Sequence, residues 1–204
     1  MLAFVLSGGG NRGALEVGAL RVLIERGIRP EMLVGTSAGA ANAAMTASDP
    51  TPEGVQRLVN AWLEATKDDV YPGNRLIAVL RSLLRQDSMF PNHCLCRFIR
   101  ARLPAGVRTF ADVRGARLYI TAVELSTGEL RIFGDDPADL LLDAIMASMA
   151  LPPYLPPWRC DGRWYIDGGA AACLPLSVAL ERGATEIYAL DLTYTGFARA
   201  SIHG

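Results

Sequence analysis

Long apolar segments are the first feature that this sequence lacks. Half of its 204 residues are hydrophobic, yet no uninterrupted apolar run reaches the ~20 residues that a membrane-spanning helix needs. We therefore expect no transmembrane segment. The first six residues carry no basic cluster and lead directly into glycines, so they predict a strand rather than a signal peptide. We expect a cytoplasmic protein with a single globular domain over residues 1–204.

An excess of charge of either sign is also missing. The net charge of −1 argues against general binding of nucleic acid. Arginines predominate between Arg75 and Arg117, whereas the stretch from Glu124 to Asp143 is mainly acidic. We expect the basic stretch to be a solvated surface, and attraction to anionic lipid headgroups is the alternative. The sequence specifies no oligomeric state.

Cysteines are few. The four of them do not have the spacing of a secreted disulfide framework; they are Cys94, Cys96, Cys160 and Cys173. Cys94 and Cys96 lie beside His93, but this group is too short and too incomplete for a zinc site. The sequence therefore predicts no metal and no cofactor.

The order of the expected elements in the first fifty residues is typical of an α/β protein. Ala3–Leu6 predicts a buried strand, and residues 7–13 form a glycine-rich loop after it. A helix ending near Gly27 follows. Its inner face is expected to carry Leu15, Ala19, Leu20, Val22 and Leu23. Met32–Val34 is the second strand, and Ala38–Ala47 is the next helix.

Between about residues 50 and 110 the sequence predicts helices and no strand. Thr51-Pro52 is a good start for the first helix, and apolar residues at positions 76–84 mark the second. The third is expected from Asn92 to Leu103. This segment is therefore interpreted as a helical insertion or cover on one side of the sheet.

The remainder returns to alternating strands and helices. The expected strands are Leu118–Val123, Leu130–Phe133, Trp164–Ile166 and Ile187–Leu190. One helix is expected to be capped by Asp136-Pro137 and ended by Pro152-Pro153, and another spans Leu176–Arg182. The whole pattern predicts a three-layer α/β/α domain with a mainly parallel central sheet.

A serine between two glycines follows the second expected strand. Residues 35–39 read GTSAG, with Gly35 and Gly39 on either side of Ser37. In such a strand-to-helix turn the neighbouring side chains must be small for the serine Oγ to project clear of the backbone. Ser37 then stands at a helix N-terminus, where the dipole favours developing negative charge. The pattern indicates a nucleophile, and a glycine-rich turn without chemistry is the alternative.

Two further elements supply what acyl transfer needs besides a hydroxyl, namely a base and oxyanion donors. Residues 8–13, GGGNRG, follow the first strand, and consecutive glycines let backbone N–H groups point at an anion. Asp167, before Gly168 and Gly169, ends a strand, so we expect it at the same carboxyl edge of a parallel sheet. An Asx turn is the structural alternative for Asp167. Pairing with a carboxylate is the alternative for Arg12.

Together these motifs resemble the patatin-like phospholipases. The likeness rests on GGGNRG, GTSAG and DGG in that order, and residues 121–129 and 147–152 also resemble family blocks. The resemblance implies a Ser-Asp dyad without histidine, in which Ser37 attacks an acyl ester and Asp167 takes its proton. It further implies an oxyanion region, with glycines that support the motifs. The oxyanion residues would be Gly8, Gly9, Gly10 and Arg12, and the supporting glycines Gly13, Gly168 and Gly169.

The substrate that the resemblance implies is an acyl lipid, a phospholipid or a simpler carboxylic ester, reached by peripheral contact with a membrane. One stretch departs from the family. After DGG the family commonly carries polar residues, often asparagines, whereas this chain has alanines and a cysteine at 170–173. Polar side-chain support behind the aspartate is therefore missing. A second hypothesis follows, in which a catalytically weak or inactive protein of the same fold acts as a membrane-associated or scaffolding module.

Two rival interpretations use the same residues. Gly8, Gly10 and Gly13 satisfy the GxGxxG pattern of dinucleotide binding, but the second strand ends in no acidic residue for the ribose. An ordinary α/β-hydrolase needs a histidine after the aspartate, and His203 supplies one. The serine comes after only two strands, however, which is too early for that fold. His93 precedes the aspartate and is expected on the surface.

Overall fold

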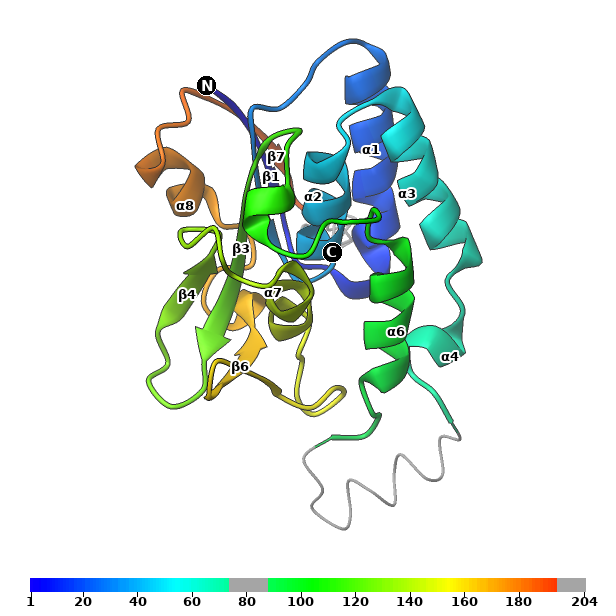
Figure 1. Ribbon diagram of the computed structural model, residues 1–204, viewed down its shortest axis with the longest axis vertical. Coiled ribbons are helices and arrows are strands. Elements are labelled where there is room, and N and C mark those ends of the chain that lie inside the picture. The colour runs from blue at the N-terminus through cyan, green and yellow to red at the C-terminus, as the bar shows by residue number, and fades with distance from the viewer. Residues whose placement is uncertain (74–87, 194–204) are drawn as a thin grey trace, which may run out of the picture.

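The computed structural model describes residues 1–73 and 88–193 (Figure 1). The strands are β1 (Leu2–Leu6), β2 (Met32–Thr36), β3 (Arg117–Glu124), β4 (Leu130–Phe133), β5 (Trp158–Cys160), β6 (Arg163–Asp167) and β7 (Glu186–Leu190). The α-helices are α1 (Gly13–Glu25), α2 (Ala38–Ser48), α3 (Pro52–Glu64), α4 (Lys67–Val70), α6 (His93–Arg102), α7 (Leu141–Ser148) and α8 (Leu176–Glu181). Three short 3-10 helices are η1 (Gly10–Arg12), η2 (Phe110–Asp112) and η3 (Gly168–Ala170).

The strands form one mixed sheet in the order β5-β6-β3-β2-β1-β7, and β4 pairs with β3 outside this order. β2 and β6 pair with successive parts of one edge of β3, and β4 pairs with the opposite edge. β7, β1, β2 and β3 run parallel to one another. β4, β5 and β6 are antiparallel to their neighbours. The α/β class with a central sheet is therefore as predicted, and its parallel part is the half that contains β1 and β2. The three-residue strand β5 was not expected.

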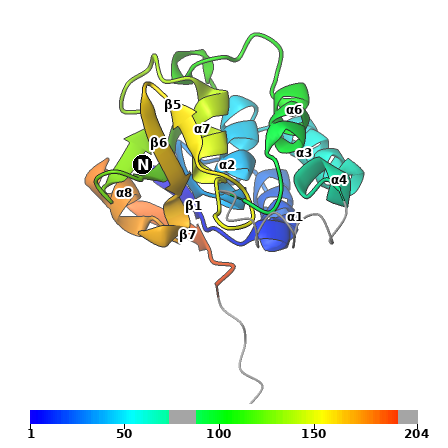
Figure 2. The same ribbon diagram turned by 90° about the horizontal axis from the view of Figure 1, so that it is seen from below.

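Helices cover both faces of the sheet, and each face has its own core. Alternate residues of one strand point to opposite faces. Phe4 and Leu6 of β1 join the larger core, which includes residues of α1, α2, α3, α6 and α7. Ala3 and Val5 of the same strand join a smaller core with Val178 of α8. Figure 2 shows α8 on one side of the strands and most of the other helices on the opposite side.

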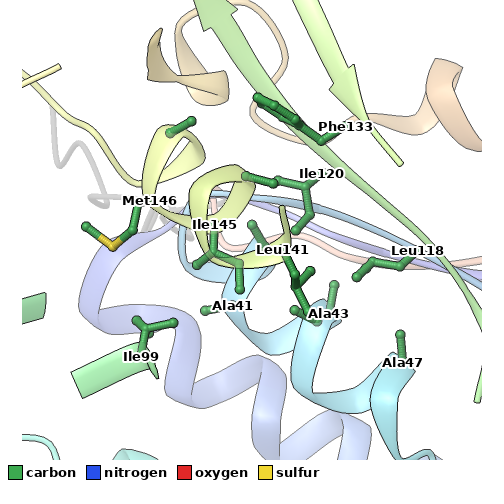
Figure 3. Close-up of a cluster of buried hydrophobic side chains, with 14 of the residues drawn as sticks. Ala41, Ala43, Ala47, Ile99, Leu118, Ile120, Phe133, Leu141, Ile145 and Met146 are labelled. Carbon is green, nitrogen blue, oxygen red and sulfur yellow. The ribbon is translucent and has the colours of Figure 1, made fainter. Parts of the chain in front are cut away.

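The centre of the larger core lies between α2, α7 and β3. Leu141 and Ile145 of α7 are fully buried, and Figure 3 shows their side chains directed toward Ala41 and Ala43 of α2. Small residues on α2 let α7 and the sheet approach it closely, since a larger side chain would occupy the space of these contacts. α2 is thus held on both sides.

In the described part of residues 50–110 the elements are the helices α3, α4 and α6, joined by irregular segments, and no strand is present there. Thr51 is the N-cap of α3, and its Oγ1 accepts a hydrogen bond from the Gly54 amide at 3.1 Å. α3 packs against α1 and α2, and α6 packs against α4 and α7. α6 lies one residue inside each predicted end. The predicted helix at 76–84 lies outside the described residues.

The inner face of α1 differs from the prediction. Leu20 is buried as expected, but Leu15 and Val22 are exposed, and Val17 and Ile24 are buried in their place. The reason is that α1 packs against α3 and α2. Hydrophobic residues occur all round this helix, so periodicity alone did not fix its orientation.

The prediction for Asp136-Pro137 was also wrong in part. The Asp136 carboxylate accepts a hydrogen bond from the Ala138 amide and closes a turn, and α7 begins only at Leu141. Buried Asp139 accepts hydrogen bonds from Arg131 and from the Gly134 amide. This segment is therefore a polar turn before the helix, since its side chains bind the loop and a neighbouring strand.

Candidate active site

Ser37 stands between β2 and α2 in a backbone conformation that few residues with a side chain adopt. Its φ is 56° and its ψ is −122°, and such a positive φ costs free energy that the surrounding structure must supply. The Ser37 amide donates a hydrogen bond of 2.8 Å to Oγ of the buried Ser148, the last residue of α7. Ser37 itself is half-buried. The strained turn is thus tied to α7 while its side chain keeps access to the outside.

The two glycines of the turn are required by close packing. A Cβ on Gly35 would collide with the Gly39 carbonyl oxygen, and a Cβ on Gly39 would come within 2.6 Å of the Leu6 carbonyl oxygen. Both obstacles are backbone atoms, which cannot move away without displacing α2 in the first case and β1 in the second. The first turn of α2 therefore lies directly on the ends of β1 and β2.

Asp167 reaches Ser37 by a different route from the one predicted. Its strand β6 is antiparallel to β3, not parallel. Thr121 of β3 pairs with Thr36 on one side and with β4 on the other, and the next residue, Ala122, pairs with Asp167 and with β4. β2 and β6 therefore occupy the same edge of β3, and their carboxyl ends meet. This end-to-end arrangement places Asp167 beside Ser37.

The Asp167 carboxyl is buried and interacts with Ser37. Only 4% of the residue is exposed. Burial raises the pKa of Asp167 above its ordinary 3.8, and hydrogen bonding with the Ser37 side chain and the Gly169 amide opposes that rise. The Gly169 amide donates to Oδ1 at 2.7 Å. The Asx turn that stood as an alternative role is thus present, and it fixes the orientation of the carboxylate next to the serine.

Two threonines connect the strand ends on which the serine and the aspartate stand. The hydroxyls of Thr36 and Thr121 are 2.7 Å apart, and Thr36 Oγ1 also donates to the Ala172 carbonyl oxygen at 3.1 Å. A Cβ on Gly168 would collide with the Thr121 side chain. Gly168 is therefore needed for the turn after Asp167 to lie against β3.

The loop after β1 borders the serine, but its amides have different roles. A Cβ on Gly8 would lie 3.3 Å from the Ser37 Cβ, whereas the Gly8 amide donates to the Cys173 carbonyl oxygen at 2.9 Å. Within the described part of the chain, the Gly9 and Gly10 amides have no acceptor. Gly10 has a φ of 56° and open space around it. Gly9 and Gly10, rather than Gly8, therefore keep amides available for an anion.

Arg12 and Gly13 follow this loop at the start of α1. Arg12 is exposed, and its amide donates to the Gly9 carbonyl oxygen at 3.1 Å. Gly13 lies under Trp62 and Ala38, which would stand 2.7 Å and 2.9 Å from a Cβ there. Gly13 thus allows α1, α2 and α3 to converge behind the site, while the Arg12 guanidinium remains at its surface.

The alanine-rich stretch at 170–173 supports the site through its main chain. The Ala172 carbonyl oxygen accepts from Thr36, and the Cys173 carbonyl oxygen accepts from Gly8. The Cys173 thiol donates to the Gly8 carbonyl oxygen at 3.4 Å. Burial raises the pKa of this thiol above 9.0. Because these contacts use carbonyl groups, they do not require the polar side chains that the stretch lacks.

A buried polar network behind the loop was not predicted. Glu16 of α1 is 1% exposed, and its Oε2 accepts a hydrogen bond of 2.9 Å from Asn42 of α2. Asn42 also donates to the Gly13 carbonyl oxygen and accepts from the Trp62 indole N–H. Burial raises the pKa of Glu16 to about 8, against hydrogen bonds from Asn42 and the Ser7 backbone. The one signal for this network was a single asparagine in an otherwise small-residue helix.

Cys173 borders this site through its contacts with Gly8, and in the described part of the chain no histidine is placed in it. His93 is exposed at the first position of α6, and His203 lies outside the described residues. In the ranges 1–73 and 88–193, no group of three or more His, Cys, Asp and Glu side chains could hold a metal ion. Over the same ranges, no helix has the length and apolar character to cross a membrane.

Comparisons with known proteins agree with this fold and these motifs. A family model described as patatin-like phospholipase matches residues 4–180. The chain is 28% identical over 198 residues to patatin-like phospholipase domain-containing protein 6 of Mus musculus. It is 29% identical over 200 residues to neuropathy target esterase sws of Drosophila melanogaster. Each match covers 94% of this chain and 13% of the relative.

Among solved structures, VipD from Legionella pneumophila is similar with a TM-score of 0.55. The match covers 82% of this chain and 45% of VipD at 16% sequence identity. At that identity the similarity shows a shared fold and carries no residue roles.

Proposed function

The chain belongs to the patatin-like phospholipase family, and from that premise we propose that it is a serine hydrolase of acyl esters. Ser37 is the nucleophile and Asp167 is the base in this proposal. Because the chain spans about 13% of the length of the curated relatives it matches, the esterase and phospholipase activities in their names support the proposal only by analogy. The residue roles rest on the geometry of this chain.

The observation that carries the proposal is the meeting of Ser37 with a buried carboxyl. A serine held at a φ of 56° in front of a helix is oriented for attack rather than for packing. The adjacent Asp167 has a raised pKa because it is buried. A carboxyl whose pKa lies nearer to neutrality accepts a proton more readily, which general base catalysis requires.

In the first half of the reaction, Ser37 Oγ attacks the ester carbonyl carbon while its proton passes to Asp167. The carbonyl oxygen becomes an oxyanion, and the unpaired amides of Gly9 and Gly10 support its stabilisation, together with the N-terminus of α2. The tetrahedral intermediate collapses when the ester C–O bond breaks. The departing alkoxide takes the proton from Asp167, which leaves an acyl group on Ser37.

In the second half, a water molecule attacks the acyl carbon and gives its proton to Asp167. The new tetrahedral intermediate expels the Ser37 oxygen, which regains a proton from Asp167. The carboxylic acid product then leaves. Asp167 acts in turn as base and acid, so one carboxyl is sufficient for both halves.

A surface next to the site supports a lipid or ester substrate met at a membrane. A hollow of about 560 Å³ is lined by Leu125, Trp158 and Trp164, with Arg159 at its side. Trp164 precedes Asp167 by three residues of β6, or about 10 Å. Tryptophans favour the membrane–water interface and arginine favours anionic headgroups. Peripheral contact through this hollow is part of the proposal, and cosedimentation with anionic vesicles, compared with Trp164→Ala, tests it.

The activity is tested by intact-mass labelling with an alkyl fluorophosphonate, which reacts with activated serines. We expect one adduct on the parent protein and on His203→Ala, and none on Ser37→Ala or Asp167→Ala. Circular dichroism establishes that each variant is folded. A folded parent that gains no adduct, even with detergent added to open access, would support the non-catalytic scaffolding hypothesis instead.

A further inference from the structure

Two residues at the end of α7 are hydrogen-bonded to the two residues of the proposed dyad. Ser148 Oγ accepts a hydrogen bond from the Ser37 amide at 2.8 Å. The Ala150 carbonyl oxygen accepts one from the Asp167 amide at 2.7 Å. The three residues 148–150 therefore join the turn after β2 to the end of β6, although these two elements are far apart in the sequence.

The end of α7 is a firm support because the helix packs against the elements that carry the dyad. α7 lies against α2, which begins after Ser37, and against β3 and β6. Its inward residues have no exposed surface; they are Leu141, Ala144, Ile145 and Ala147. Movement of the helix would open gaps between these packed surfaces, which the dense interior of a protein resists. Ser148 is therefore held in a fixed place relative to both strand ends.

The Ser148 hydroxyl is bonded differently from that of a second serine at a helix end. Ser48, the last residue of α2, donates its hydroxyl to the Ala44 carbonyl oxygen at 2.7 Å. Such a bond to the carbonyl four residues earlier recurs for serines inside helices. Ser148 is likewise the last residue of its helix. In the described ranges its hydroxyl bonds only to the Ser37 amide, so its Oγ is directed out of α7 toward the nucleophile.

The Ser37 amide needs this acceptor because of the conformation of its residue. A φ of 56° is higher in free energy than a helical or extended φ. Over residues 1–73 and 88–193, Ser148 Oγ is the only acceptor for this amide. Loss of the bond would leave the N–H unpaired and would remove a contact that holds the strained φ. A change in that φ would move Ser37 Oγ relative to Asp167.

We propose that Ser148 is a positioning residue, which holds Ser37 in the strained conformation that directs its Oγ toward Asp167 and the ester. The inference rests on the proposed function, because it assumes that Ser37 attacks the ester. Ser148 has no exposed surface, so it touches no substrate and acts only through the Ser37 backbone. It therefore affects the rate of attack and leaves the binding of the ester unchanged.

The test is Ser148→Ala, which removes the acceptor and leaves the Ala150 bond to Asp167 in place. With a p-nitrophenyl carboxylic ester we expect kcat to fall about ten- to a hundredfold and KM to stay within about twofold of the parent. The rate of labelling by an alkyl fluorophosphonate should fall by the same factor as kcat. Ser148→Cys keeps a weak acceptor, so its kcat should lie between those of the parent and Ser148→Ala.

Ser48→Ala is the matched control, since it removes a serine hydroxyl from a helix end without touching the Ser37 amide. We expect its kcat and KM to equal those of the parent, and circular dichroism establishes that each variant is folded. A folded Ser148→Ala that loses no more activity than Ser48→Ala would overturn the positioning role. If Ser148→Ala does not fold, hydrogen exchange of the parent decides by NMR, because a Ser37 amide that exchanges as fast as an exposed amide would contradict the bond.

Failure of the proposed function gives a different result. In that case the parent itself hydrolyses the ester no faster than Ser37→Ala and gains no fluorophosphonate label. Slow exchange of the Ser37 amide in that inactive parent, and fast exchange in Ser148→Ala, would show a structural bond without chemistry. The positioning role would then be rejected together with the activity.

Discussion

Asp167 and Glu16 are two buried carboxyls in different surroundings. Both are almost inaccessible to solvent, and burial raises the pKa of each. Asp167 meets the hydroxyl of Ser37, which is half-buried and open to a substrate. Glu16 meets the amide of Asn42, which is itself enclosed by Gly13 and Trp62. Burial alone therefore does not make a carboxyl a candidate base, since only one of the two has a proton donor that a substrate can reach.

The largest expected difference between the two carboxyls is in turnover. Asp167→Asn keeps the shape of the side chain but removes its ability to accept a proton, so kcat should fall about 10²- to 10⁴-fold, the usual contribution of a general base. Glu16→Gln should lower kcat less than tenfold. Steady-state hydrolysis of a p-nitrophenyl carboxylic ester measures both. Equal losses in the two variants would remove the distinction between a catalytic and a structural carboxyl.

The second largest expected effect is the change of kcat/KM with pH. In the proposed mechanism Asp167 must be ionised to accept the Ser37 proton, and burial raises its pKa above the ordinary 3.8. Below that pKa, kcat/KM should rise about tenfold per pH unit and then level off. The midpoint should lie above 3.8 in the parent and stay unchanged in Glu16→Gln. A midpoint that moves in Glu16→Gln would show that Glu16 takes part in the titration.

The ionisation of Glu16 should instead affect how the stability of the folded protein depends on pH. Its pKa is about 8 in the folded protein against an ordinary 4.5, so between these values the folded state binds more protons than the unfolded state. The free energy of unfolding should therefore fall as the pH rises through this window, by up to about 1.4 kcal/mol per pH unit. Urea denaturation between about pH 6 and pH 8 measures this slope, and Glu16→Gln should flatten it. A slope unchanged by the substitution would contradict the buried, neutral state of Glu16.

The smallest effect on stability and turnover is expected from a substitution of Leu15, the residue before Glu16. Leu15 neighbours Glu16 but is 68% exposed, so Leu15→Ala should change the free energy of unfolding by no more than about 0.5 kcal/mol. Turnover should stay within twofold of the parent. Thermal unfolding measures the first quantity, and hydrolysis of the same p-nitrophenyl ester measures the second. If the free energy of unfolding fell by several kcal/mol, Leu15 would have to lie on the inner face of α1, as its periodicity predicted.

The sequence predicted the parts of the site whose residue types are demanded by close packing. Gly35 and Gly39 face backbone atoms at distances that exclude any side chain, so their pattern is readable without a structure. Most of the strands and helices in the described ranges were expected for a similar reason, since their apolar periodicity matches the faces they bury.

The direction of β6 and the role of Glu16 were not predicted, for physical reasons. The DGG motif indicates that Asp167 ends a strand but does not give the direction of that strand, which is shown by the antiparallel pairing of Ala122 with Asp167. A glutamate in the first turn of a helix is normally assigned to solvent, because burial of a charge is costly. Glu16 becomes neutral instead, because burial raises its pKa, and that burial follows from the packing of α1 against α2 and α3, which the local sequence does not reveal.

Because β2 and β6 meet end to end, the register of the sheet sets the distance between Ser37 and Asp167. Ser37 and Asp167 are positioned by how far each strand has advanced along the same edge of β3. A slip of one residue in β6 would shift Asp167 by about 3.3 Å and turn its carboxylate to the opposite face. We therefore expect insertions and deletions in the β5–β6 hairpin to disturb the proposed chemistry more than most side-chain substitutions there, because they change which residue of β6 pairs with Ala122.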